Sequence, residues 1–186
     1  MPHTAATLPS ARERLFVALD VPDVPAARTL VTRLGTSVSC YKIGLELMLG
    51  GGLELARELR AAGKTVFIDL KLLDIPNTVE AATANIVRAG LDYLTVHGHD
   101  RKTLDAAVRG RQAGRLKLLA VTVLTSLDVV DLAEQGIVGT RPVDLVVHRA
   151  ELAKAAGFDG VIASGHEAAA VRRAVGPDFL IVTPGV

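Results

Sequence analysis

The chain has 186 residues, of which 49% are hydrophobic and 22% are charged, a composition typical of a soluble globular domain. Its 21 Lys and Arg residues nearly balance its 20 Asp and Glu residues, and only 3% of residues are aromatic, which argues against a nucleic-acid-binding or membrane-surface protein. The longest strongly apolar stretch, 118–127, is too short to span a bilayer.

The first 13 residues are polar and lack the apolar segment of a signal peptide. We therefore expect a flexible N-terminal arm, 1–13, followed by one domain, 14–186, that is long enough to bury a substantial core. The single cysteine, Cys40, cannot form an internal disulfide, which suits a reducing compartment. These features predict a cytoplasmic protein.

Short apolar runs alternate along the chain with segments rich in Ala, Leu, Arg and Glu. The expected strands are 15–20, 39–44, 65–71, 93–98, 118–125, 160–165 and 179–185. Each is almost entirely apolar, as parallel strands covered by helices should be. The intervening helical patterns include 24–35, 52–63, 78–90 and 150–157, each ending in a glycine placed like a helix C-cap. This alternation predicts a single α/β domain.

Polar side chains gather at the C-terminal ends of the expected strands. They are Asp20, Lys42, Asp69, Lys71, His97, Thr125, Ser164 and Thr183. An open doubly wound sheet binds its ligand at one switch point and does not need a polar group at every strand end. A (β/α)8 TIM barrel instead collects all its strand ends around one mouth, where the active site lies. We therefore predict a (β/α)8 TIM barrel.

Only seven strands are found before the sequence stops at Val186. Barrels of this type typically need about 250 residues and rarely have fewer than about 200. We expect the last strand–helix unit to lie beyond this sequence, so that the barrel domain is incomplete at its C-terminal end.

The third expected strand is unusual because it carries charges in its second half, in the run VFIDLKLLDIPNT (66–78). Residues i and i+2 of a strand share a face, so Asp69 and Lys71 are expected to project together. Asp74 follows in the next loop, and Lys42 lies at the matching end of the neighbouring strand. Two ammonium and two carboxylate groups form a neutral set that can be buried. A salt bridge on a solvated rim is the alternative, but a charge cluster in a barrel mouth favours a functional site.

The run DLKLLDIPNT, with Lys42 in YKIG and Asp20 in ALD, resembles the bacterial type of the orotidine 5′-phosphate decarboxylase family. The segments VHG (96–98), VLTS (123–126), DGVIAS (159–164) and TPGV (183–186) follow in the family's order. The resemblance covers roughly 14–186. It implies a lyase of pyrimidine biosynthesis that makes UMP from orotidine 5′-phosphate without a cofactor or a metal ion.

The resemblance also implies roles for individual residues. The family's catalytic charge network corresponds to Lys42, Asp69, Lys71 and Asp74, and Lys71 is the expected general acid. Loss of CO2 leaves a carbanion at C6 of the pyrimidine, which a fixed ammonium can stabilise and then protonate. Asp69 is expected to face the departing carboxylate.

The remaining implied residues concern substrate binding and assembly. Asp20, Thr78 and Thr125 join Lys42 and Asp69 as expected substrate-binding residues, Asp20 at the ribose hydroxyls and Thr125 near the pyrimidine. In the family, the residues matching Asp74 and Thr78 enter the site from the partner subunit, which implies a homodimer with shared active sites. The family's phosphate-binding arginine and Gly-Arg pair correspond to positions after Val186.

Two alternatives stay open. The D-x-K-x-x-D core is shared with metal-dependent 3-keto-sugar-phosphate decarboxylases and aldolases on the same barrel, although the continuation as IPNT disfavours them. A truncated, non-catalytic nucleotide-binding relative is the second alternative.

His97 and His99 could suggest a metal site, but no carboxylate cluster accompanies them in the sequence. The run 97–103 is expected to be a loop that departs from the glycine-rich family pattern.

Overall fold

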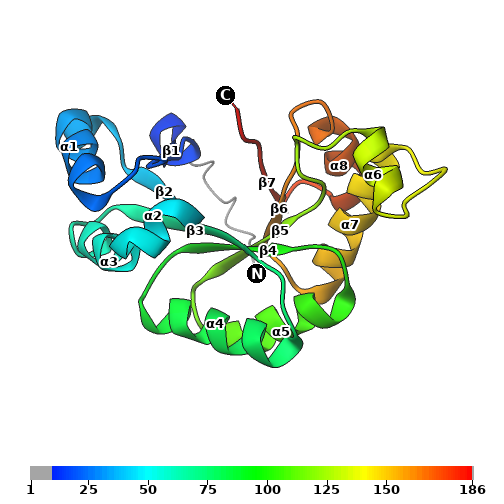
Figure 1. Ribbon diagram of the computed structural model, residues 1–186, viewed down its shortest axis with the longest axis horizontal. Coiled ribbons are helices and arrows are strands. Elements are labelled where there is room, and N and C mark those ends of the chain that lie inside the picture. Colours follow the sequence, from blue (N-terminus) through cyan, green and yellow to red (C-terminus); the bar gives the residue numbers. More distant parts are fainter. Residues whose placement is uncertain (1–9, 186) are drawn as a thin grey trace, which may run out of the picture. The chain divides into compact units, whose positions relative to one another are not determined.

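The computed structural model describes residues 10–185, which fall into two compact units, one up to Asp69 and one from Leu70 onward (Figure 1). Strand β3 (Thr65–Leu72) crosses the boundary between them. Most of the expected N-terminal arm, residues 1–9, lies outside the described residues. Residues 11–13 of the expected arm form most of a short 3-10 helix, η1 (Ala11–Arg14).

The first unit contains three parallel strands in chain order. They are β1 (Val17–Ala18), β2 (Cys40–Gly44) and the first part of β3. The register pairs Val17 with Tyr41 and Gly44 with Asp69. The connecting helices are α1 (Val24–Leu34), η2 (Gly35–Ser37), α2 (Leu45–Leu47), the π-helical turn η3 (Met48–Gly52) and α3 (Leu53–Ala61). Tyr41 and Ile43 are completely buried and form part of the core.

Local sequence explains where these helices begin and end. Asp23 caps α1 by accepting a hydrogen bond of 2.8 Å from the main-chain N of Ala26, and Pro25 occupies the first turn. The helix ends at Gly35, whose φ of 53° favours glycine. Gly50 and Gly51 have non-helical backbone angles between α2 and α3, so the GGG run forms a turn.

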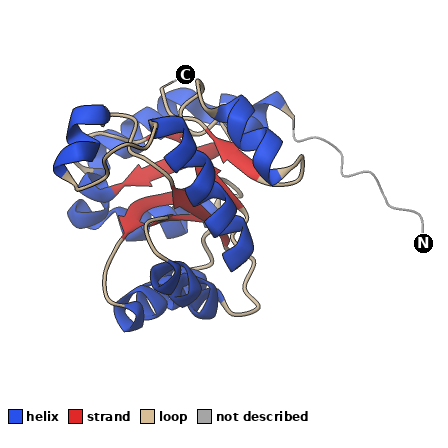
Figure 2. Ribbon diagram, turned by 90° about the vertical axis from the view of Figure 1, so that its right-hand side faces the viewer, coloured by secondary structure: helices blue, strands red, loops and turns tan. Residues whose placement is uncertain are grey.

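The second unit contains four parallel strands in chain order after the end of β3. They are β4 (Tyr93–His97), β5 (Lys117–Val121), β6 (Gly160–Ile162) and β7 (Leu180–Val182). Its helices are α4 (Pro76–Arg88), α5 (Arg101–Arg111), α6 (Val129–Glu134), α7 (Pro142–Ala156) and α8 (Ala168–Val175). Strands alternate with helices along the chain, with two helices, α6 and α7, between β5 and β6. Figure 2 colours the helices blue and the strands red.

Helices α4 and α5 lie side by side at the bottom of Figure 1, and the turned view of Figure 2 agrees. Gly110 of α5 makes this close approach possible. A Cβ on Gly110 would lie 2.8 Å from Cβ of Thr83 and would also overlap the main-chain oxygen of Glu80. The two helices can therefore pack at this distance only because position 110 has no side chain.

The parallel strands follow the chain order, with helices between them, which is the topology of the predicted (β/α)8 TIM barrel with seven strands in the described residues. Four strands are shorter than expected by three residues or more: 15–20, 118–125, 160–165 and 179–185 are observed as 17–18, 117–121, 160–162 and 180–182. Between residues 10 and 185, no helix combines the length and the apolar character needed to cross a membrane.

Candidate active site

Three of the predicted site residues meet in the first unit. The ammonium nitrogen of Lys42, on β2, lies 2.9 Å from Oδ1 of Asp20 and 3.7 Å from Oδ2 of Asp69. Asp20 follows β1, and Asp69 lies in β3. The predicted proximity of Lys42 to the charged strand is therefore confirmed for Asp69, and Asp20 joins the same cluster.

Burial differs among these three side chains, to which we refer as the Lys42 cluster. The side chains of Lys42 and Asp69 are 21% and 14% exposed, whereas that of Asp20 is 60% exposed. The two carboxylates offset the desolvation cost of the partly buried ammonium and hold it in place. The exposed carboxylate of Asp20 retains lone pairs that can accept hydrogen bonds from ligand hydroxyl groups.

Lys71 has an unusual backbone. Its φ is 49°, in the left-handed region that residues with a Cβ rarely adopt. Its main-chain N donates a hydrogen bond of 2.9 Å to Oγ1 of Thr95, in β4 of the same unit. That the side chains of Asp69 and Lys71 project together stays a prediction. A left-handed backbone at a non-glycine residue raises the conformational free energy of the folded protein by about 1–3 kcal/mol, and such residues are concentrated at functional sites.

Asp74 and Thr78 are both exposed in the second unit. Asp74 lies between β3 and α4, and its Oδ1 accepts a hydrogen bond of 2.6 Å from the main-chain N of Ile75. Its neighbours Leu73 and Ile75 are 53% and 67% exposed. Thr78 lies in the first turn of α4. An exposed carboxylate between two exposed apolar side chains is therefore available to another molecule.

Thr125 does not end a strand, contrary to the prediction. β5 stops at Val121, which pairs with Ile162 at the end of β6. The last contact with β6 is made by Thr122, whose main-chain N donates to the oxygen of Ile162 at 3.3 Å, and the chain then turns, with the main-chain N of Leu127 donating to the oxygen of Leu124 at 2.9 Å. Thr125 is exposed in this turn.

The expected loop 97–103 is also shorter than predicted, because α5 begins at Arg101. Asp100 caps this helix by accepting hydrogen bonds from N and Oγ1 of Thr103 at 2.9 and 2.8 Å. The rings of His97 and His99 stack with a centroid distance of 4.6 Å. Within residues 10–185 no three His, Cys, Asp or Glu side chains are grouped so as to hold a metal ion.

One charged residue of this unit was missed by sequence reasoning. Arg149, on α7, is 7% exposed, and its Nη1 donates a hydrogen bond of 2.5 Å to the main-chain oxygen of Thr122, just after β5. Burial lowers the pKa of Arg149, and partial burial together with the Arg149 charge lowers the pKa of His99. Arg149 lies three residues after the buried Val146, on the apolar side of its helix, and this spacing could have signalled its burial.

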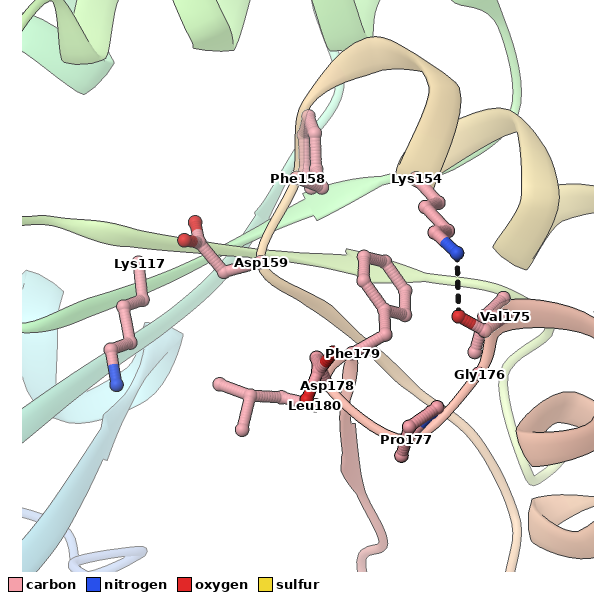
Figure 3. A pocket seen from close by; sticks show the side chains of 10 residues that line it. All are labelled: Lys117, Lys154, Phe158, Asp159, Val175, Gly176, Pro177, Asp178, Phe179 and Leu180. Carbon is pink, nitrogen blue, oxygen red and sulfur yellow. Dashed lines mark hydrogen bonds between the residues drawn. The ribbon is translucent and has the colours of Figure 1, made fainter. Parts of the chain in front are cut away.

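A cavity of about 500 Å³ lies elsewhere in the second unit (Figure 3). It is lined by residues at or before the N-terminal ends of β5, β6 and β7, among them Lys117, Asp159 and Phe179. The ammonium of Lys154 points to the main-chain oxygen of Val175, at 2.7 Å. None of the predicted site residues lines this cavity, which lies at the opposite ends of the strands from those where we predicted the site.

Comparison with known proteins identifies related sequences. Residues 13–186 match the family model described as "Orotidine 5'-phosphate decarboxylase / HUMPS family". The chain is 52% identical over 177 residues to an orotidine 5′-phosphate decarboxylase of Rhodopseudomonas palustris, covering 95% of this chain and 74% of that protein. It is 53% identical over 175 residues to the corresponding protein of Methylobacterium radiotolerans, covering 94% and 75%.

Solved structures support the same relationship. A crystal structure of orotidine 5′-phosphate decarboxylase from Lactobacillus acidophilus matches with a TM-score of 0.85 and 33% sequence identity, over 92% of this chain and 80% of that one. An uncharacterized conserved protein from Geobacillus kaustophilus matches with a TM-score of 0.85 and 38% identity, over 91% and 82%. These matches confirm the predicted fold class.

Proposed function

The chain belongs to the orotidine 5′-phosphate decarboxylase / HUMPS family, and from this premise we propose that it converts orotidine 5′-phosphate to UMP and CO2 in pyrimidine biosynthesis. The observation that carries the proposal is the Lys42 cluster, in which an ammonium lies between two carboxylates. Sequence identity above one half with a named decarboxylase supports the same reaction.

The chemistry places specific demands on the site. The bond between C6 and the carboxylate breaks, its electron pair stays on C6, and CO2 leaves. Without a cofactor to accept that electron pair, the enzyme must stabilise the negative charge at C6 with a fixed positive group. We assign this role to the Lys71 ammonium, which then transfers a proton to C6 and recovers one from water. The left-handed backbone of Lys71 supports a functional assignment.

The other charged residues would assist Lys71. Asp69 would face the substrate carboxylate, where like-charge repulsion favours loss of CO2. Lys42 and Asp74 would orient Lys71 and keep the set of four charges neutral. Asp20 would accept hydrogen bonds from the ribose hydroxyls, a role that its 60% exposed side chain supports. Thr125 would contact the pyrimidine from its exposed turn.

We also propose that the protein acts as a homodimer with shared sites, in which Asp74 and Thr78 of each subunit serve the site of the other. The exposed apolar side chains of Leu73 and Ile75, on either side of Asp74, support this proposal because a partner subunit would cover them. The reaction would take place in the cytoplasm. This location is supported by the single cysteine, Cys40, because a chain with one cysteine has no internal disulfide that a reducing compartment would break.

The function is tested by incubating the protein with orotidine 5′-phosphate and measuring UMP, with and without EDTA. We expect UMP formation that EDTA does not change. Lys71→Ala should retain less than about a hundredth of the activity, because general acid–base catalysis contributes about 10²–10⁴-fold. Lys102→Ala, at an exposed position of α5, serves as the matched control and should leave the rate unchanged.

The outcomes separate the alternatives. Activity that disappears with EDTA and returns with a divalent metal ion would favour a metal-dependent sugar-phosphate enzyme. Binding of UMP without turnover would favour a non-catalytic nucleotide-binding protein. Full activity of Lys71→Ala would contradict the general-acid assignment while leaving the overall reaction in place.

A further inference from the structure

Gly44, the last residue of β2, lies beside the charges of the Lys42 cluster. It pairs in register with Asp69, and it follows Lys42 by two residues, so both positions face the same side of the sheet. A Cβ built on Gly44 would lie 3.2 Å from Oδ1 of Asp20 and 3.5 Å from Nζ of Lys42. The space next to Gly44 is therefore the space in which the ion pair of Asp20 and Lys42 forms.

We propose that Gly44 is a positioning residue of the active site, because the absence of a side chain allows the Asp20 carboxylate to reach the Lys42 ammonium. The role of this pair in binding the ribose of the substrate rests on the proposed function. The spatial requirement itself rests only on the distances within the first unit.

Backbone conformation does not explain a glycine at this position. Gly44 has φ −87° and ψ −179°, an extended conformation that any residue adopts. By contrast, Gly51 has φ 98°, and a Cβ on Gly52 would lie 2.6 Å from the main-chain oxygen of Leu47. The nearest atoms around Gly44 belong instead to two charged side chains.

An alanine at position 44 should change the ion pair and leave the fold intact. The contact of 3.2 Å with Oδ1 of Asp20 is tighter than most real Cβ contacts, so this carboxylate must move by a few tenths of an ångström, whereas 3.5 Å from Nζ of Lys42 is an ordinary contact. Asp20 moves most easily, because its side chain is 60% exposed and lies outside the strands. Turning this carboxylate away lengthens its 2.9 Å contact with Lys42 and removes the ribose acceptor from its place.

The experiment is a double-mutant cycle on Gly44→Ala and Asp20→Ala. We expect Gly44→Ala to reduce kcat/KM for UMP formation by about 3- to 10-fold, since the Asp20 carboxylate must move by a few tenths of an ångström and a full misplacement of about 1 Å can cost about 100-fold. In the Asp20→Ala background, where the clashing carboxylate is gone, Gly44→Ala should change kcat/KM by less than about twofold. The midpoint of urea unfolding should be unchanged by Gly44→Ala.

Gly50→Ala is the matched control. Gly50 has φ −85° and ψ 16°, and the nearest atom to its added Cβ would be the main-chain oxygen of Pro22, at 4.0 Å. This substitution should leave kcat/KM within about twofold of the wild type, because ordinary surface substitutions have small effects. An equal loss from Gly44→Ala with and without Asp20 would overturn the proposal.

A second readout separates this proposal from the proposed function. NMR of the wild type and variants follows the chemical shift of the Lys42 side chain, which reports on its contact with Asp20 and needs no turnover. We expect Gly44→Ala to change the shift more in the wild-type background than in Asp20→Ala, because only the former contains the carboxylate that must move. A wild type that forms no UMP would refute the function only, whereas a Lys42 signal that is insensitive to Gly44→Ala would refute the positioning role.

Discussion

The guanidinium of Arg149 donates a hydrogen bond from Nη1 to the main-chain oxygen of Thr122, at a distance of 2.5 Å. Thr122 also donates from its Oγ1 to the oxygen of Ile162, at 2.8 Å. Arg149 thus connects α7 to the residue that follows β5, three residues before Thr125. A buried arginine here stabilises the peptide from which the exposed turn of Thr125 begins.

The first prediction concerns this contact. Arg149→Met should reduce the free energy of unfolding by about 1–3 kcal/mol, because the buried oxygen of Thr122 loses its donor. Arg149→Lys should reduce the free energy of unfolding by less than Arg149→Met, since an ammonium can still donate a hydrogen bond to this oxygen. Urea unfolding measures both effects. Arg173→Met, at an exposed position of α8, is the control and should change the stability by less than about 0.5 kcal/mol.

An increase in the free energy of unfolding of Arg149→Met is the outcome that would contradict this prediction. Burial disfavours the charge of Arg149, as its lowered pKa indicates, and a well-packed methionine avoids that cost. An increase in stability would mean that desolvation of the guanidinium outweighs its hydrogen bond, and would contradict our assignment of Arg149 as a stabilising residue of this unit.

The second prediction concerns Gly110, where helix propensity and packing have opposite effects. In the interior of an exposed helix, Gly→Ala normally stabilises a protein by up to about 1 kcal/mol. A Cβ at position 110 would instead lie 2.8 Å from Cβ of Thr83, between α5 and α4. We expect Gly110→Ala to destabilise the protein by about 1–3 kcal/mol, as overpacking does. A stabilised variant in urea unfolding would show that the two helices can separate without cost.

Sequence reasoning predicted best the strands that are marked by a local apolar run. β2 and β3 are dense apolar runs, and their ends were predicted to within one residue, which brought Lys42 and Asp69 to the same end of adjacent strands. The Lys42 cluster follows from this register. Asp20 was predicted at the end of the first strand and as a ribose contact, but its ion pair with Lys42 was not predicted, and β1 itself is only two residues long.

Other features depend on residues far away in the chain, so the sequence pattern alone could not reveal them. β5 ends at Val121, where the paired residues of both neighbouring strands, His97 of β4 and Ile162 of β6, also end, and Thr125 therefore lies in a turn and not at a strand end. The left-handed backbone of Lys71 coincides with a hydrogen bond to Thr95, 24 residues later. Likewise, the importance of Gly44 becomes visible only when Asp20, from another segment, lies beside it.

The third prediction concerns pH. Partial burial and the charge of Arg149 lower the pKa of His99, so the folded protein binds a proton at this site less readily than the unfolded chain. The unfolded chain therefore binds more protons as the pH falls through the ordinary histidine pKa of about 6.5, and stability decreases with acidification. His99→Gln removes this contribution. Between about pH 7.5 and about pH 5.5, the wild type should lose more stability than the variant.

Urea unfolding of both proteins across this range provides the measurement. The baseline is the difference between the free energies of unfolding of the wild type and His99→Gln at about pH 7.5, where the histidine is mostly neutral in the folded and the unfolded state. A difference that stays constant down to about pH 5.5 would mean that the environment of His99 does not disfavour its charged form.

The last prediction concerns the proposed sharing of sites between two subunits. Asp74→Ala and Lys71→Ala chains should each be nearly inactive as homodimers, because every site then lacks one essential charge. In a mixed dimer, one site would contain both substitutions and the other would contain neither. Equal mixing with free exchange should therefore restore about a quarter of the wild-type activity, since half of the dimers are mixed and each has one intact site.

The comparison requires proof that subunits exchange, for which differently tagged chains can be co-purified after mixing. A mixture of Lys71→Ala with Asp69→Ala chains is the control. Asp69 and Lys71 would serve the same site of one subunit, so every site in such a mixture lacks a charge and activity should stay at the level of the separate variants. If exchange is demonstrated and the Asp74→Ala mixture stays equally inactive, then Asp74 acts within its own subunit and the two sites are not shared.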